Sequence, residues 1–286
     1  MAPARGSLYP GGRCPNAVLA AGKPGLEPGA ASWAGQLSGQ LVPEHRRIRQ
    51  AVSGLCARSA RPRVHGQAPV SYSLDCFVTF LSDFLSALGL DRTHLVGHSW
   101  GGAVALRFAG QYPERVERLV LAGSPGLGPN VSLWLRLMTL PLFNTNAARV
   151  GRKVLRIASR TVIVRPEKRT AEWIGMTQER MKISETRAVV RAVTRNHLRL
   201  RGVRPEVMKA IRTELPALKV PTLVIHGLND WLIPPSNVAF AKTLNPTLEV
   251  KLLERCGHEL QYECAEEFNQ AVLEFLGRPV DSHSRS

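Results

Sequence analysis

The sequence has no long apolar run, and this absence excludes the classes of protein that cross a membrane. None of its 286 residues lies in a stretch approaching the roughly 18 apolar residues that a membrane-spanning helix needs. Near the N-terminus the apolar stretch 17–21 is too short for the core of a secretory signal peptide. We therefore expect no membrane insertion and a cytoplasmic location.

Cysteine is also scarce. The chain has five cysteines, an odd number, and no C-x-x-C pair. This pattern argues against a disulfide framework and against a zinc cluster, so we expect reduced and mostly buried thiols. The sequence implies neither a metal nor an organic cofactor.

Acidic residues are too few to balance the basic ones. The formal net charge is +16, with 38 Lys and Arg against 22 Asp and Glu. Residues 136–213 hold 19 basic groups and five acidic ones. Because the arginines are scattered and no nucleic-acid motif accompanies them, we expect a solvated basic surface and no nucleic acid. An anionic small ligand is the alternative.

The first 70 residues contain no Asp and no Phe, and 43 of them are Ala, Arg, Gly, Pro or Ser. Neither the period of a helix nor that of a strand persists there. We expect residues 1–68 to form an atypical, poorly ordered segment. Residues 279–286 are expected to form a disordered tail.

Regular alternation of helices and strands begins at about residue 71. It predicts an α/β fold with a mostly parallel sheet flanked by helices. The core would comprise residues 69–126 and 216–278, and residues 127–215 would form an inserted helical cap over the carboxyl edge of the sheet. The expected strands are 93–96, 116–122, 221–225 and 248–253, and the expected helices are 72–88, 101–112, 131–140, 169–181, 185–198, 236–244 and 263–276.

The segment Gly97-His98-Ser99-Trp100-Gly101 is a G-x-S-x-G motif between an expected strand and an expected helix. A sharp turn there exposes the serine hydroxyl, and the glycines leave room for the crowded backbone. The helix N-terminus places positive partial charge beside Ser99. The amide N–H of Trp100 is then a candidate oxyanion donor.

A serine hydroxyl needs a base, and the base needs an orienting acid. Asp230 and His258 each follow an expected strand, so both would lie at the same edge of the sheet as Ser99. The chain order Ser, Asp, His is the order found in one class of serine hydrolases. Together the three residues predict a catalytic triad.

Residues 69–277 resemble the α/β-hydrolase fold family. The resemblance rests on residues 95–102, on Tyr112-Pro113-Glu114-Arg115-Val116, on residues 221–227 and on Cys256-Gly257-His258. It implies that Ser99 is the nucleophile, Asp230 the acid and His258 the base. A serine at position 99 also argues against the related dehalogenases and epoxide hydrolases, which need a carboxylate nucleophile.

Residues 123–129 and the segment around His258 are similar to the branch of carbon–carbon hydrolases that act on meta-cleavage products of aromatic rings. That branch usually has tryptophan directly after the catalytic histidine, where this chain has Glu259. A cap arginine that binds the substrate carboxylate would favour this reading, but the sequence does not select one.

The family's N-terminal His-Gly strand end and its Asp-x-Pro-Gly-x-Gly-x-Ser loop are not intact. Val64-His65-Gly66 lies too close to Ser99 in sequence, whereas residues 29–33 are at a suitable distance and make Ala30 a candidate second oxyanion donor. We hypothesise that part of residues 1–68 is not ancestral hydrolase sequence, through a frame, start or splice change. Losing an oxyanion donor costs on the order of 10²–10³ in rate.

The sequence thus predicts a serine hydrolase acting on a small ester or related carbonyl substrate. Carbon–carbon bond hydrolysis is one alternative, and a catalytically impaired hydrolase-fold protein is another. Trp134, Trp173 and Trp231 are candidates for an apolar substrate pocket. The expected partner is a small-molecule substrate, and a homo-oligomer remains open.

Overall fold

The computed structural model describes residues 18–19, 72–140, 156–182 and 184–278. Of residues 18–19, 180–182 and 184–189 it describes the backbone alone. The predicted atypical segment 1–68, apart from Val18–Leu19, and the predicted tail 279–286 therefore lie outside the described residues.

The main sheet contains five strands within the described residues, in the order β1, β2, β3, β6, β7. Four of them are parallel and β1 runs antiparallel to β2, which confirms the predicted mostly parallel sheet. The strands are β1 Val18–Leu19, β2 Thr93–His98, β3 Val116–Ala122, β6 Thr222–Gly227 and β7 Glu249–Leu253.

Strand β2 extends two residues beyond the predicted range, so that it ends directly before Ser99. On its outer side it pairs with β1, where Val18 lies opposite Gly97 and Leu19 opposite Val96. These two residues are the only part of the described chain that covers this side of β2.

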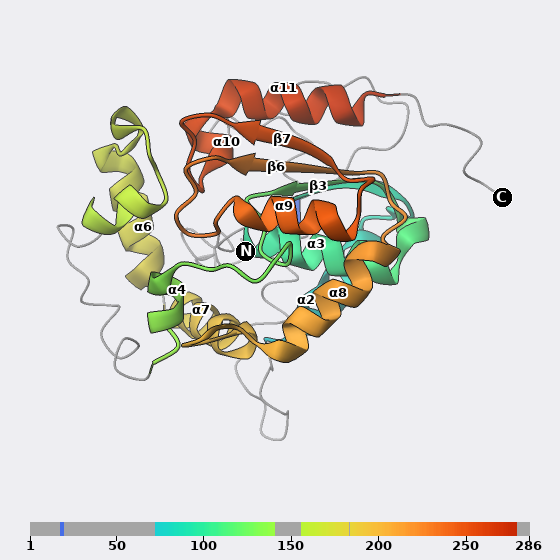
Figure 1. Ribbon diagram of the computed structural model, residues 1–286, viewed down its shortest axis with the longest axis horizontal. Helices are drawn as coiled ribbons and strands as arrows, with labels where there is room; N and C mark the ends of the chain where they lie inside the picture. Colours follow the sequence, from blue (N-terminus) through green and yellow to red (C-terminus); the bar gives the residue numbers. More distant parts are fainter. Residues whose placement is uncertain (1–17, 20–71, 141–155, 183, 279–286) are drawn as a thin grey trace, which may run out of the picture.

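Helices cover both faces of the sheet (Figure 1). Helices α2 Leu74–Ala87, α3 Trp100–Gln111, α8 Pro205–Ala217 and α9 Ser236–Leu244 lie on one face. Helices α10 Leu260–Glu263 and α11 Ala265–Leu276 lie on the other. Among the helices that the structure describes, none combines the length and apolarity needed to cross a bilayer.

The two faces bury alternate side chains of the central strand β3, as the period of a strand requires. Leu119 and Leu121 belong to the core cluster formed with α2, α3, α8 and α9. Val120 and Ala122 belong to the cluster formed with α11. All four side chains are fully buried. Burial of each leucine contributes about 1.5–3 kcal/mol to stability. The side chains of β3 therefore help to hold the helices on both faces of the sheet.

Helix α2 shows how the sequence directs this packing. Its buried residues Val78, Leu81 and Leu85 recur three and four positions apart and therefore share one face of the helix. Ser73 caps its N-terminus, because the hydroxyl accepts the amide N–H of Cys76 at 3.2 Å.

Residues 127–215, which we call the inserted segment, connect β3 to β6, and their described part is mostly helical, as predicted from the missing strand pattern. A short antiparallel β4–β5 pair was not predicted, because strands of two residues leave no alternation to detect. The elements besides α8 are α4 Leu133–Leu137, η5 Ser159–Thr161, η6 Pro166–Lys168, α6 Ala171–Lys182, α7 Ser184–His197, β4 Leu198–Arg199 and β5 Gly202–Val203. The boundaries of a separate cap domain stay a prediction.

The expectation of reduced thiols is wrong for two cysteines. Cys256 and Cys264 form a disulfide, with their Cα atoms 6.3 Å apart. The turn after β7 brings Cys256 back against α10, a contact that the eight-residue spacing alone does not reveal. Cys76 is a free cysteine.

Candidate active site

Ser99 occupies the sharp turn between β2 and α3. Its backbone has φ 51°, a left-handed conformation that a non-glycine residue adopts at a cost of about 1–3 kcal/mol. The strand and the helix hold it there, since its N–H donates to Ala122 O at 2.9 Å and its carbonyl accepts Gly102 N–H at 2.8 Å. Strain that neighbouring elements enforce at one serine is typical of a functional turn.

Gly97 and Gly102, on either side of Ser99, have no room for a side chain. A Cβ on Gly97 would lie 2.6 Å from Gly101 O and from the Cα of Gly102. A Cβ on Gly102 would collide with the side chain of Ser124 on the loop after β3. Both glycines therefore allow α3 to start immediately beside β2.

The structure brings Ser99, Asp230 and His258 into one hydrogen-bonded chain. His258 Nε2 lies 2.9 Å from Ser99 Oγ, and His258 Nδ1 lies 2.7 Å from Asp230 Oδ2. The three residues follow β2, β6 and β7, whose carboxyl ends meet at one edge of the sheet. In Figure 1 the arrowheads of β6 and β7 point toward the side that carries α4 and α6. Ser99 can therefore pass its proton to His258, and Asp230 can hold the tautomer that accepts it.

The Asp230 carboxylate is buried, and both of its oxygens accept hydrogen bonds. Its Oδ1 accepts the backbone N–H groups of Leu232 and Ile233 at 2.8 and 2.9 Å. Burial opposes its ionisation, but the neighbouring His258 and hydrogen bonds from His226 and His258 outweigh burial. The pKa of Asp230 is therefore well below its usual value, and the carboxylate stays charged.

The pKa of His258 moves in the opposite direction. Burial alone would lower this pKa, but the charge of Asp230 and the hydrogen bond to it raise the pKa of His258 above its ordinary value. A raised pKa makes the imidazole a stronger base toward the Ser99 hydroxyl.

Sequence reasoning missed His98, which fixes the backbone beside the imidazole. Its Nε2–H donates to the carbonyl oxygen of His258 at 2.8 Å. Burial lowers the pKa of His98, so the ring is held neutral with one nitrogen as donor. Its position inside the G-x-S-x-G motif was visible, but the contact to a loop 160 residues later was not.

Glu263 was also missed, although it is almost completely buried. Its Oε2 accepts the N–H of Gly257 at 2.7 Å, and its Oε1 accepts the N–H groups of Val164 and Arg165. The carboxylate thus joins the loop that carries His258 to the inserted segment. Nothing in the local sequence signals this role, because Glu263 is one of four glutamates between residues 259 and 267.

The same two segments meet directly beside the imidazole. The N–H of His258 donates to Val162 O at 2.8 Å. A Cβ on Gly257 would lie 2.6 Å from that carbonyl oxygen, so only glycine allows this approach. Residues 162–165 therefore support the His258 loop.

The structure describes only one of the two candidate oxyanion donors. Trp100 is the first residue of α3, so its N–H has no partner within the helix and is available at the turn. The Trp100 ring packs edge-on against His197 of α7, with ring centroids 4.5 Å apart. Ala30 lies outside the described residues.

The three candidate pocket tryptophans do not enclose a cavity. Trp231 is 67% exposed and Trp134 is 45% exposed. Trp173 is half-buried on α6. Rings as exposed as the first two lie on the surface of the molecule instead of lining an interior pocket.

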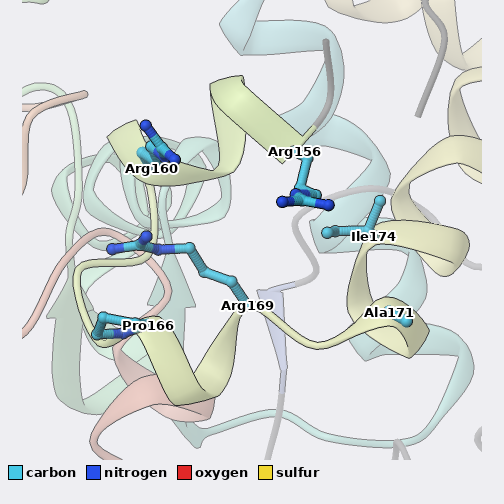
Figure 2. A pocket seen from close by; sticks show the side chains of 6 residues that line it. All are labelled: Arg156, Arg160, Pro166, Arg169, Ala171 and Ile174. Carbon is cyan, nitrogen blue, oxygen red and sulfur yellow. The ribbon is translucent and has the colours of Figure 1, made fainter. Parts of the chain in front are cut away.

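A hollow of about 380 Å³ lies between the η5–η6 region and α6. Figure 2 shows the side chains of Arg156, Arg160 and Arg169 around it, with Ile174 on the α6 side. Hydrogen bonds to Ile163 O at 2.9 Å and Val164 O at 2.6 Å hold Arg169 in place. Among the described residues that line the hollow, three carry guanidinium groups and none carries a carboxylate, which suits a small anion.

Within the described residues no group of three His, Cys, Asp or Glu side chains could hold a metal ion. The polar groups assembled at this edge of the sheet are suited to proton transfer and nucleophilic attack.

Comparison with known proteins identifies the family of the chain. The sequence profile described as alpha/beta hydrolase fold matches residues 56–265. The chain is 34% identical over 208 residues to 2-hydroxy-6-oxononadienedioate/2-hydroxy-6-oxononatrienedioate hydrolase of Burkholderia vietnamiensis, covering 69% of this chain and 67% of the relative. It is 32% identical over 214 residues to 2-hydroxymuconate semialdehyde hydrolase of Pseudomonas putida, covering 74% and 72%.

Solved structures show the same fold. The 2-hydroxy-6-oxo-6-phenylhexa-2,4-dienoate hydrolase of Rhodococcus sp. strain RHA1 has a TM-score of 0.61 at 21% identity, over 74% of both chains. A membrane phospholipase A, described as a bacterial virulence factor, has a TM-score of 0.60 at 25% identity, over 76% of this chain and 66% of that one. The chain therefore belongs to the α/β hydrolase fold family and is a hydrolase of that fold.

Proposed function

We propose that the chain is a serine hydrolase in which Ser99 is the nucleophile, His258 the general base and Asp230 the orienting acid. The observation that carries the proposal is the continuous chain of hydrogen bonds at 2.9 and 2.7 Å through the imidazole. The substrate class is a small ester or a related carbonyl compound.

The reaction follows from this geometry. Ser99 Oγ attacks the carbonyl carbon while its proton passes to His258 Nε2. The N–H of Trp100 stabilises the oxyanion that forms. His258 then returns the proton to the leaving alcohol, and an acyl group remains on Ser99. Water, deprotonated by His258, attacks the acyl carbon, and the acid leaves as the serine regains its proton.

Carbon–carbon bond hydrolysis of a meta-cleavage product is the second candidate. The two curated relatives above carry names of such hydrolases. Substrates of this class carry a carboxylate, and the hollow with Arg156, Arg160 and Arg169 offers guanidinium groups that would bind one. Glu259, in place of the tryptophan usual in that branch, favours the ester reading.

A substrate comparison tests the proposal. We expect the purified chain to hydrolyse a short p-nitrophenyl ester, and the Ser99→Ala variant to lose that activity while keeping its fold. Faster turnover of a ring-cleavage dienoate than of the ester would favour the second candidate. A folded chain that turns over neither class would contradict both and support the impaired-hydrolase alternative.

A further inference from the structure

The described part of the chain exposes few large apolar side chains, and most of them gather on three neighbouring segments. We call the following five the apolar patch: Leu133 (65% exposed), Trp134 (45%), Leu200 (49%), Leu228 (43%) and Trp231 (67%). Contiguous exposed apolar groups on a soluble fold mark a surface that binds something.

Hydrogen bonds and packing bring these segments together. The N–H of Ser132, which begins α4, donates to Leu232 O at 3.0 Å, so α4 lies against the loop after Asp230. On another side α4 packs against β4, next to the turn that carries Leu200. The loop 228–233 follows β6, so the patch lies at the carboxyl edge of the sheet, where Ser99 also lies.

Most of the charges around the patch are positive, although Arg204 pairs with exposed Glu206 at 3.7 Å. Its segments, residues 127–140, 195–204 and 228–236, contain five arginines, and their single acidic residue is the buried Asp230. At the β4–β5 turn, exposed Leu200 stands between exposed Arg199 and Arg201. The partner that this surface fits is therefore both apolar and negatively charged.

We propose that the apolar patch docks the chain on the surface of a bilayer that contains anionic lipid. Tryptophan and leucine side chains enter the boundary between headgroups and acyl chains, and neighbouring arginines attract the lipid charge. Docking places the Ser99 edge of the sheet beside the lipid. If the proposed function holds, an ester dissolved in the membrane then reaches Ser99 from that side.

The experiment is sedimentation with vesicles, using the full chain that carries Ser99→Ala so that hydrolysis does not alter the lipid. We expect binding to vesicles of equal parts phosphatidylcholine and phosphatidylglycerol. Binding to pure phosphatidylcholine should be weak, and salt at about 1 M should remove most of the binding to the anionic vesicles. No binding of the folded protein, or equal binding to both vesicles, would overturn the proposal.

Two sets of variants locate the surface. Trp231→Ala with Leu133→Ala should lower the partition onto anionic vesicles by about tenfold or more, because two large apolar groups no longer leave water. Arg199→Glu with Arg201→Glu should do the same. The matched controls are Leu273→Ala on α11, and Lys219→Glu with Lys251→Glu, all exposed and away from this edge. Equal losses in the controls would contradict the assignment.

A second copy of the chain is the competing occupant. If the patch variants convert a dimer into a monomer in solution and leave vesicle binding unchanged, the patch is an interface between copies and the proposal is wrong. Because binding is measured with Ser99→Ala, its failure is independent of any failure of the hydrolase chemistry.

Discussion

The carboxylate of Glu263 accepts the N–H of Gly257, the residue directly before His258, at 2.7 Å. Its other oxygen accepts two N–H groups of the inserted segment. One buried carboxylate therefore sets how the loop carrying the imidazole sits against residues 162–165.

Replacing Glu263 with alanine should destabilise the chain and displace His258. Glu263 accepts three N–H groups, and each one left buried without a partner costs about 1–3 kcal/mol, so we expect a loss of at least about 3 kcal/mol of unfolding free energy. In a chain of this size that lowers the melting temperature by roughly 6–12 °C.

Glu263→Gln separates positioning from stability. It keeps one acceptor oxygen, so we expect a folded protein whose rate of ester hydrolysis falls about tenfold, equivalent to about 1.4 kcal/mol in the barrier. The exposed Glu266→Gln is the matched control and should behave as wild type. A fully active Glu263→Gln would show that the carboxylate does not position His258.

Gly97→Ala should disrupt the turn at Ser99. The new Cβ would lie 2.6 Å from backbone atoms of α3, which cannot move away as a flexible side chain can. We expect a loss of at least about 2 kcal/mol in urea unfolding, together with lost activity. Gly110→Ala, where nothing lies within 4 Å of the added Cβ, is the control and should gain about 0.5–1 kcal/mol. Equal effects at both glycines would contradict this account of the motif.

The pH dependence of ester hydrolysis should report the pKa of His258. The base must be neutral, so the rate should rise with pH through a midpoint above the ordinary histidine value, because Asp230 raises this pKa. In Asp230→Asn the negative charge is gone, so the midpoint should move to lower pH and the plateau rate should fall by about 10⁴. A midpoint that Asp230→Asn leaves in place would contradict the pairing.

The arginine hollow gives a test of where the carboxylate of a dienoate substrate binds. Arg156→Gln with Arg160→Gln should raise KM for a dienoate carboxylate by about tenfold and leave KM for a neutral ester unchanged. The control is Arg212→Gln, an exposed arginine of α8. If KM for both substrates is unchanged, the hollow does not hold the substrate carboxylate.

Much of the fold could be predicted because its helices and strands follow from local patterns in the sequence. The spacing of Leu81, Phe84 and Leu85 indicates a helix with one buried face, and the apolar run of β3 indicates a buried strand. The positions of Asp230 and His258 after successive strands were enough to predict that they would meet Ser99.

The remaining features depend on contacts between distant segments. Glu263 faces Val164 and Arg165, which lie almost 100 residues earlier, and no local pattern in either segment signals the other. The Cys256–Cys264 disulfide joins residues only eight apart, but it depends on how the turn after β7 folds back, which the spacing does not reveal. Trp231 was a candidate pocket residue, but its side chain is 67% exposed, which residue type alone does not reveal.

The most direct test of the central claim is labelling of the full chain with a fluorophosphonate probe, with the modified residue identified by peptide mass spectrometry. Only a serine activated by a neighbouring base reacts quickly with such a probe. The account predicts a single modified residue, Ser99, and no labelling of folded Ser99→Ala or His258→Ala. Unchanged labelling of Ser99→Ala, or no labelling of the folded wild-type chain, would contradict it.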